Sequence, residues 1–404
     1  MKVCYFAAIA ASVVLVAGCD SVHQGTKVEK NLAVQRLEGI KAATEFEIAK
    51  QSYLGGDLDK SFKAINRSIA LNANMPKSYI LRGRIQLEQG DLEGSVASFQ
   101  QASKVDEKSV EAQYYQGLIA ERINHQEEAL AFFTKAADLD TQNAQYLIAA
   151  AETLIDLNRI DEAAAFLQTR GDKFQHNAGV RQTLGHLAMI QKNPESAVNH
   201  FNEARLLAPE DTGIVEDLLH AQMAVGQFAD AEFNLQRLLK SEKGKTRRDL
   251  KHLRAECLVK VDRLLDAREL FIQLTSGPEG QADVDGWIGL GNVSFMLKDN
   301  SRLKLAAART IAVAPNRSEG YVLRALYQRR TGDLKSAQIN LHQALGYKAD
   351  AETYLLLAIV QDEMQQTDAA KETLNALLAL DPNNTQARQL LGTVGQPVAA
   401  APER

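Results

Sequence analysis

Gly244-Lys245-Thr246 has the residue types that end a phosphate-binding loop. Such a loop needs a Gly five residues before Gly244, where this chain has Leu239, and a strand that leads into it. The sequence predicts no strand there. We therefore reject nucleotide phosphate chemistry at this position.

Histidine spacing gives no support for a metal site. The 8 His residues include no HExxH pair and no nearby Cys pair, so the usual zinc ligand sets are missing. The Gly-x-Ser-x-Gly turn of a serine hydrolase is also absent, and Asp and Glu are scattered as on solvated helix faces. We predict no catalytic residue, no metal ligand, no cofactor, no small-molecule substrate and no enzymatic activity.

Composition favours a folded helical protein over a nucleic-acid binder. Of 404 residues, 45% are hydrophobic, 24% are charged and only 8 are Pro, so a core can form and helices can run uninterrupted. The net charge is -5 with the signs interspersed, which leaves no electrostatic footprint for nucleic acid. Cys257 is the only Cys beyond residue 19, which excludes a disulfide framework, and we predict that it packs in the core.

The first nineteen residues follow the pattern of a secretion signal. Met1 and Lys2 supply a positive charge, and residues 3–16 form an uncharged apolar run that is too short to span a membrane comfortably. The run ends in Val-Ala-Gly-Cys19, which resembles the lipobox of bacterial lipoproteins. The resemblance implies lipidation of Cys19, so that acyl chains hold the protein on a membrane without spanning it. The alternative is an ordinary signal peptide that is cut nearby, with Cys19 incidental.

Residues after Cys19 bear on location. Asp20 resembles the signal that retains enterobacterial lipoproteins in the inner membrane. We therefore expect a lipid-anchored protein that faces the periplasm, with the inner membrane favoured and the outer membrane the alternative. Residues 20 to about 31 are polar and turn-prone, which predicts a tether.

A 34-residue pattern recurs from about residue 42 onward, which predicts a solenoid of helix pairs. The tip of the turn within each pair carries a Gly or Asn, at Gly56, Gly90, Asn124, Asn158, Gly226 and Gly332. A small residue follows five positions later, at Ser61, Ser95, Ala129, Ala163, Ala197, Ala231, Ala267 and Ala337. We count ten repeats, starting near residues 42, 76, 110, 144, 178, 212, 248, 284, 318 and 351.

These positions resemble the tetratricopeptide repeat family. Trp287-Ile-Gly-Leu290-Gly291 matches the family's Trp, two residues, Leu-Gly pattern, and Gly83, Gly117 and Gly185 take the same Gly position in other repeats. The resemblance implies an all-α fold, a right-handed superhelical solenoid of about ten helix-turn-helix repeats. Two extra residues precede each of repeats seven and eight. In repeat eight Leu303 replaces the small residue and Ala307 the large one, so we expect irregular packing there.

The predicted organisation has four segments. Residues 1–18 form the signal peptide, 19–41 the lipidated Cys, tether and N-terminal helix, 42–384 the ten repeats, and 385–404 a C-terminal capping helix with a disordered tail. The helix expected at residues 28–40 would cover the N-terminal end of the array.

Ligand contacts in this family tend to come from the second, fifth, ninth, twelfth and thirteenth positions of each repeat. Carried over to this chain, that rule predicts a concave groove with His, Met and Phe character, which suits apolar side chains of a peptide or helix. Its residues would be His186, Met189, His220, Met223, His252, Phe295 and Met296. The alternative is that these side chains only pack within the repeats.

A dense basic run coincides with the extra residues before repeat seven. It predicts a docking patch for an acidic partner segment or anionic lipid headgroups, formed by Lys243, Lys245, Arg247, Arg248 and Lys251. The alternative is a solvated loop between repeats.

Together these features predict a scaffold lipoprotein that binds other proteins during assembly of an envelope complex, such as a pilus or a secretion system. The sequence resembles the tetratricopeptide pilotins and assembly factors of such systems in architecture alone. An adaptor or regulatory subunit for a periplasmic protease or peptidoglycan enzyme is the alternative.

Overall fold

The computed structural model describes residues 10–241 and 243–395, and for residues 10–27 it describes the backbone only. The described residues form helices and turns with no strand, which confirms the all-α prediction. The chain divides into an N-terminal part, Met1–Pro209, and a C-terminal part, Glu210–Arg404. The beginning of the predicted signal peptide, residues 1–9, and the predicted disordered tail at 396–404 lie outside the described residues.

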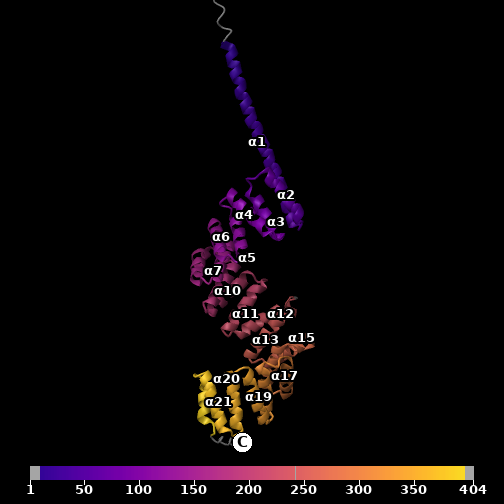
Figure 1. Ribbon diagram of the computed structural model, residues 1–404, viewed down its shortest axis with the longest axis vertical. Coiled ribbons are helices and arrows are strands. Elements are labelled where there is room, and N and C mark those ends of the chain that lie inside the picture. The colour runs from indigo at the N-terminus through magenta and orange to yellow at the C-terminus, as the bar shows by residue number, and fades with distance from the viewer. Residues whose placement is uncertain (1–9, 242, 396–404) are drawn as a thin grey trace, which may run out of the picture. The chain divides into compact units, whose positions relative to one another are not determined.

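Helices of the N-terminal part pair in sequence order (Figure 1). They are α1 (Ala10–Leu54), α2 (Leu58–Leu71), α3 (Pro76–Glu88), α4 (Leu92–Val105), α5 (Val110–Arg122), α6 (Gln126–Leu139), α7 (Ala144–Asp156), α8 (Ile160–Arg170), the 3-10 helix η1 (Gly171–Phe174), α9 (Ala178–Ile190) and α10 (Pro194–Leu207).

The C-terminal part continues the same pairing and adds short insertions. Its elements are α11 (Thr212–Ala224), α12 (Phe228–Lys240), η2 (Gly244–Thr246), α13 (Arg248–Lys260), α14 (Leu264–Leu274), α15 (Gly277–Gln281), α16 (Val284–Met296), α17 (Asn300–Val313), α18 (Ser318–Arg330), α19 (Leu334–Tyr347), α20 (Ala351–Glu363), α21 (Thr367–Leu380) and α22 (Thr385–Thr393). In repeats two to ten the first helix begins at residue 76, 110, 144, 178, 212, 248, 284, 318 or 351.

A residue in the left-handed backbone region ends the first helix of every pair. These residues have φ between +57° and +84°, and the turn closes with bonds such as Asp91 N–H to Gln86 O at 2.8 Å. Six of the ten are the predicted Gly and Asn residues, and the others are Lys192, Asp262, Lys298 and Gln365. Because a side chain disfavours this conformation, these four positions are strained relative to Gly.

Small residues in each pair let two helix backbones approach. The predicted small residues of the second helices are all 0% exposed. The Gly residues of the first helices have no room for a Cβ atom, which would lie 2.4–2.7 Å from a Phe ring carbon. These contacts join Gly83 with Phe99, Gly117 with Phe133 and Gly185 with Phe201.

Repeat eight departs from this packing, as its sequence predicts. Leu303 and Ala307 are buried in a cluster with Leu323 of the following repeat. A Cβ added at Gly291 would lie 2.5 Å from a methyl carbon of Leu323. In the other repeats the corresponding Gly faces a residue of the repeat's own second helix. The exchange of large and small residues therefore moves the close contact to the neighbouring repeat.

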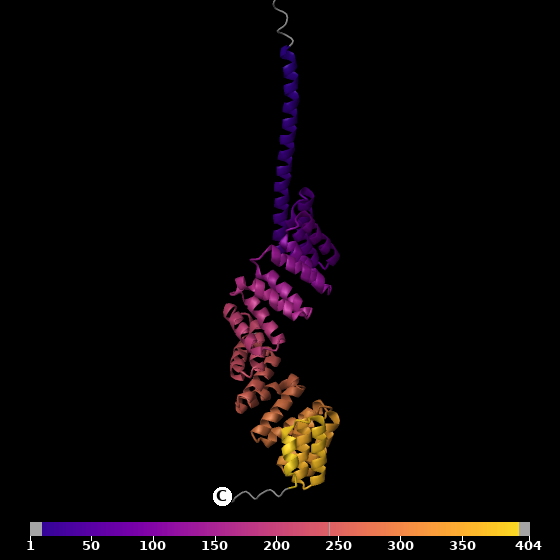
Figure 2. The same ribbon diagram turned by 90° about the vertical axis from the view of Figure 1, so that its left-hand side faces the viewer.

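Helix α1 differs from its prediction in two ways. Residues 20–31 are helical and not turn-rich, because no Pro interrupts α1 before Gly55 and the backbone stays in one helix (Figures 1 and 2). Residues 28–38 are all exposed and cover no apolar surface of the repeats, so the expectation that the segment at 28–40 covers the end of the array is wrong. Only the last turns of α1, with Ala42 and Ala49 buried, pack against α2.

Helix α22 covers the apolar surface of the last pair. Ala387 is buried, and Leu390 and Leu391 pack on the cluster that contains Leu374 and Leu377. No helix within the described residues combines the length and apolar character that crossing a bilayer requires.

Candidate protein-binding site

The predicted groove residues lie on first helices of their pairs. His186 and Met189 are on α9 of the N-terminal part, whereas the others belong to α11, α13 and α16 of the C-terminal part. His220 is exposed and Met296 is 49% exposed, so both can meet a ligand.

Three other predicted groove residues have packing partners. The ring of His186 lies 5.3 Å from that of Phe201, and Met223 packs on the core cluster of repeats six and seven. Phe295 packs on the Leu303 cluster and is covered by the Arg330 guanidinium at 4.2 Å. Their side chains stabilise the array, and ligand binding by these three stays a prediction.

His252 belongs to an ionic network that joins α13 to the start of α16. Its Nε2 lies 2.9 Å from Asp283 Oδ2, and the same carboxylate pairs with Arg248. Asp283 also caps α16 by accepting from Gly286 N–H at 2.8 Å. Burial alone would raise the pKa of Asp283, but these hydrogen bonds outweigh it and lower the pKa below its ordinary value.

A pocket of about 450 Å³ opens beside His252, between α13 and α16. Its lining combines aliphatic and charged side chains from the two first helices and one residue of α14. The lining residues are His252, Glu256, Val259, Lys260, Phe271, Asp285, Ile288, Gly289, Asn292 and Val293. Only His252 among them was predicted as a binding residue, although most of the others occupy the repeat positions from which family ligands are bound.

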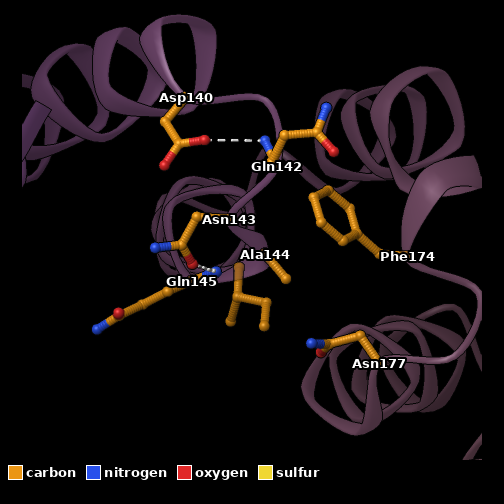
Figure 3. Close-up of a pocket in the computed structure, with 8 residues that line it drawn as sticks. Asp140, Gln142, Asn143, Ala144, Gln145, Phe174 and Asn177 are labelled. Carbon is orange, nitrogen blue, oxygen red and sulfur yellow. Dashed lines mark hydrogen bonds between the residues drawn. The ribbon is translucent and has the colours of Figure 1, made fainter.

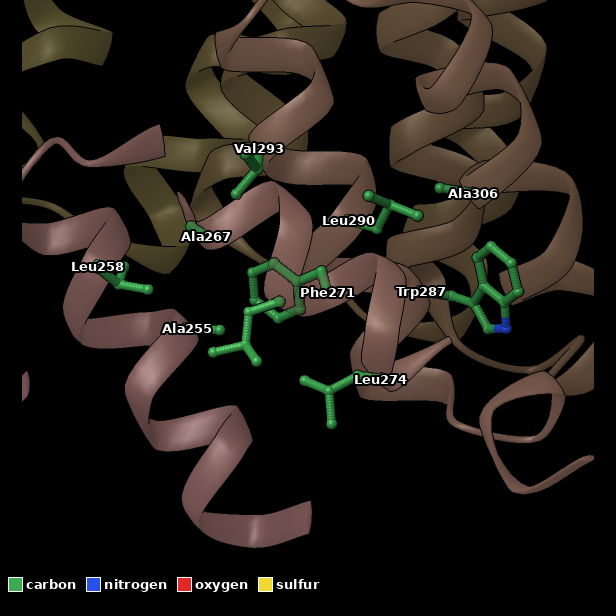
Figure 4. Close-up of a cluster of buried hydrophobic side chains, with 10 residues drawn as sticks. Ala255, Leu258, Ala267, Phe271, Leu274, Trp287, Leu290, Val293 and Ala306 are labelled. Atoms are coloured by element: carbon green, nitrogen blue, oxygen red, sulfur yellow. The ribbon is translucent and has the colours of Figure 1, made fainter. Parts of the chain in front are cut away.

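Phe271 of α14 forms the floor of this pocket. Its ring lies in the middle of the buried cluster, between Leu258 of α13 and Leu290 of α16 (Figure 4). A Cβ on Gly289 would lie 2.2 Å from the Phe271 ring, so Gly is required where α16 passes over it. The missing side chain at Gly289 leaves the space above the ring open.

Charged groups surround the mouth of the pocket. Glu256, Lys260 and Asn292 are exposed, and neither Glu256 nor Lys260 has an ion-pair partner among the described residues. Asp285 lies 3.3 Å from Arg317 of the next repeat. An apolar floor with unpaired charges of both signs at its rim can hold an aliphatic side chain of a polypeptide and bind polar groups on either side of it.

Two arginines of the predicted basic patch are engaged within the chain. Arg247 pairs with Glu216 at 3.0 Å and with Asp249 at 2.6 Å, and Arg248 pairs with Asp283 and donates to Leu274 O at 2.6 Å. Their positive charge is therefore largely neutralised at the surface. Lys243 and Lys245 are exposed on either side of Gly244, and a docking role for the patch stays a prediction.

A second pocket, of about 530 Å³, lies in the N-terminal part beside η1 (Figure 3). It exists because α8 ends early and Phe174 of η1 points into the space left beside α7. Two of its side-chain oxygens already accept helix-capping bonds: Asn143 Oδ1 accepts from Gln145 N–H at 3.0 Å, and Asn177 Oδ1 accepts from Val180 N–H at 3.1 Å. This pocket offers few free polar groups to a ligand.

Among the residues that the structure describes, no three His, Cys, Asp or Glu side chains lie close enough together to hold a metal ion. Cys257 is buried, in agreement with the prediction that it is a core residue.

Sequence profiles of a known repeat family match parts of the chain that form helix pairs. One tetratricopeptide repeat profile matches residues 80–144, and a second matches residues 127–187 and 329–393. The chain contains tetratricopeptide repeats. Arrays of tetratricopeptide repeats act as protein–protein interaction scaffolds and are typically non-enzymatic, because stacked helix pairs present an extended surface.

Individual relatives are distant. The Protein CTR9 homolog of Arabidopsis thaliana is 25% identical over 245 residues, which cover 52% of this chain and only 22% of that protein. Among solved structures, the type IV pilus biogenesis factor PilW is 16% identical with a TM-score of 0.45, covering 51% of this chain and 97% of PilW. YrrB, a tetratricopeptide repeat protein with an unusual peptide-binding site, is 15% identical with a TM-score of 0.37, covering 44% of this chain and 90% of YrrB.

Proposed function

We propose that this protein is a membrane-anchored scaffold lipoprotein whose tetratricopeptide repeats bind a segment of another protein. The pocket between α13 and α16 carries the proposal. It is open at the first-helix face, has the Phe271 ring as an apolar floor, and presents the unpaired charges of Glu256 and Lys260. Aliphatic anchoring combined with flanking polar contacts is how grooves of this kind hold peptides.

Anchoring at Cys19 is supported by the N-terminal sequence, in which an apolar run and two small residues precede the Cys. Helix α1 would connect this anchor directly to the first repeat. Ala42 follows Cys19 by 23 residues, so an unbroken helix would hold the repeats about 35 Å from the lipid. Such a spacer leaves the binding face accessible to partners.

The partner we propose is a component of an envelope assembly machine, such as a pilus or secretion system. Stacked helix pairs that present an extended surface suit a protein that holds subunits while others are added. The lipobox and Asp20 favour the periplasmic face of the inner membrane. A periplasmic protease or peptidoglycan enzyme as partner is the competing outcome of the experiment that follows.

Site-specific photo-crosslinking from position 292 tests the binding site. Asn292 is exposed at the rim of the pocket, and a photoreactive residue there should crosslink to the partner in native membranes. The matched control places the same residue at Leu305 of α17, which is 48% exposed and outside the pocket. Recovery of pilus or secretion components at position 292 alone supports the proposal, whereas a hydrolase supports the adaptor role. Equal crosslinking from both positions would contradict the assigned site.

Cys19→Ala tests the anchor separately. The variant should move from the membrane fraction to the soluble periplasmic fraction, because the acyl chains supply the membrane affinity. Unchanged fractionation would refute lipidation at Cys19 and leave the binding site untouched.

A further inference from the structure

We propose that the helix pair α9–α10, the last pair of the N-terminal part, is a pH-sensitive element that opens in mild acid through protonation of His200. His200 lies on α10 and is half-buried. It occupies the second-helix position of a polar pair that is found in several other repeats, but the partner position on α9 holds Ala188. This element belongs to a different part of the chain from the pocket between α13 and α16.

Four repeats contain the complete polar pair. In each of them a Gln of the first helix is hydrogen-bonded to a polar side chain twelve residues later, on the second helix, at 2.6–3.1 Å. The pairs are Gln86 with Ser98, Gln222 with Asn234, Gln328 with Asn340 and Gln361 with Thr373. Because each donor meets an acceptor, these polar groups can be buried at little cost.

Other repeats place apolar residues at both positions. These combinations are Ala120 with Phe132, Leu154 with Phe166 and Leu258 with Leu270. The pair α9–α10 has neither solution, since His200 is polar and Ala188 offers no side-chain hydrogen bond. Accordingly, the Nδ1 atom of His200 is buried and has no hydrogen-bond partner within the described part of the chain. Ser294 of α16, opposite Ala306 in the repeat pattern, is similarly unpartnered among the described residues, but a hydroxyl does not titrate in this pH range.

Protonation of His200 inside the closed pair is unfavourable. A protonated imidazole donates from both ring nitrogens, and Nδ1 meets no acceptor there. A charge that is kept away from water also loses its hydration. Opening of α9–α10 lets water solvate the charged ring, so protonation and opening of the pair favour each other.

Nearby charges do not offset this effect. Within the N-terminal part α10 packs against α9, and the charged groups that act on the ring are Arg181 of α9 and Glu203 of α10. They pair with each other at 3.0 Å, and their effects on His200 oppose each other. Burial lowers the pKa of His200 below its ordinary value. The neutral ring therefore stabilises the pair above about pH 6.5, and this contribution is lost as the pH falls from there toward the lowered pKa.

Opening of this pair would alter the binding surface as well as the local stability. Helix α9 carries His186 and Met189, two of the predicted groove residues. When α9 separates from α10, these side chains lose the backbone position that the repeat gives them. Acid would thus release a ligand held at α9 while the neighbouring pairs stay folded.

Hydrogen exchange of the full chain, read by mass spectrometry, tests the proposal. Protection of each helix is compared at about pH 7.5 and about pH 5.5, after correction for the intrinsic effect of pH on exchange. We expect protection of α9 and α10 to fall by up to about tenfold at the lower pH, because a solvated His is about 90% protonated there. The pair α3–α4 is the control in the same sample, since it has the complete Gln86–Ser98 pair and no His. Its protection should change by less than about twofold.

Two variants assign the effect to His200. Ala188→Gln combined with His200→Asn copies the Gln222–Asn234 pair, so it should raise protection of α9–α10 about tenfold at pH 7.5 and remove the effect of acid. His200→Leu copies Leu270 of repeat seven and should remove the effect of acid without adding a hydrogen bond.

Both variants keep His176 and His186, the other His residues of this region. An acid effect that persists in either variant, or an equal fall of protection in α3–α4, would overturn the proposal. A paired variant that gains no protection would overturn the assignment of His200 to an incomplete polar pair. Unchanged helix content of both variants by circular dichroism at pH 7.5 excludes misfolding as the cause.

Discussion

Replacing Asp283 by Asn removes the charge that links α13 to α16 and leaves the size of the side chain unchanged. Asn caps a helix about as well as Asp, so the bond to Gly286 N–H is kept. The ionic contacts to Arg248 and His252 are lost, and the Asp283 side chain is only 11% exposed. One charge-assisted contact of this kind contributes about 1.5–3 kcal/mol. Because the amide oxygen of Asn serves the cap, its NH2 group faces Arg248 and cannot accept a hydrogen bond from it, and we expect Asp283→Asn to cost about 2–3 kcal/mol.

Urea unfolding followed by the fluorescence of Trp287 measures this effect. Trp287 is the single Trp of the chain and lies in a buried cluster one turn after Asp283, so its signal reports on this region. That local signal matters because repeat arrays can unfold in steps. Asp285→Asn is the control, since the Asp285 side chain is 74% exposed and its pair with Arg317 is worth less than about 0.5 kcal/mol. Equal losses from both variants would refute the role assigned to the network.

Acid should reduce the difference between Asp283→Asn and the parent protein. The pKa of Asp283 is lower in the folded than in the unfolded protein, so its carboxylate stabilises the fold fully above about pH 4. That contribution is lost as the pH falls through the lowered pKa. A difference that stayed constant down to about pH 2 would show that the charge of Asp283 is not responsible.

The remaining predictions use the same structure. Lys298→Gly should stabilise the chain by about 0.5–1 kcal/mol because Lys298 has φ of +59°, and Gly332→Ala at the same turn position should destabilise it; urea midpoints with the wrong sign would contradict the strain argument. Gly83→Ala should cost about 1–3 kcal/mol by overpacking, whereas Gly346→Ala, with nothing within 4 Å, should be neutral or stabilising in thermal melts. Burial raises the pKa of Cys257 to about 11, so iodoacetamide at pH 8 should label it only after unfolding, as mass spectrometry would show.

Periodicity made most of the fold predictable. The turn tips with Gly or Asn carry a recognisable signal, because these residues tolerate the left-handed conformation. Lys192, Asp262, Lys298 and Gln365 take the same conformation without that signal, and only their spacing from the other tips could have revealed them. The course of α1 was harder to predict. The residues after Cys19 are polar and turn-prone, yet they remain helical because no Pro interrupts α1.

Pairing between distant residues limited the prediction of the binding site. The sequence shows Arg247 and Arg248 in one basic run, but it does not show that Glu216 and Asp283, about one repeat away in each direction, neutralise them. Which residues form ion pairs across neighbouring repeats depends on how the helices stack. The residue types alone do not show this.

The unbroken course of α1 has a mechanical consequence. A turn-rich linker absorbs tension by uncoiling, whereas a continuous helix passes both tension and twist to whatever holds its far end. In this chain that end is the contact of Ala42 and Ala49 with α2. If Cys19 is fixed in a membrane, force on a bound partner must pass through the packing of the N-terminal repeat.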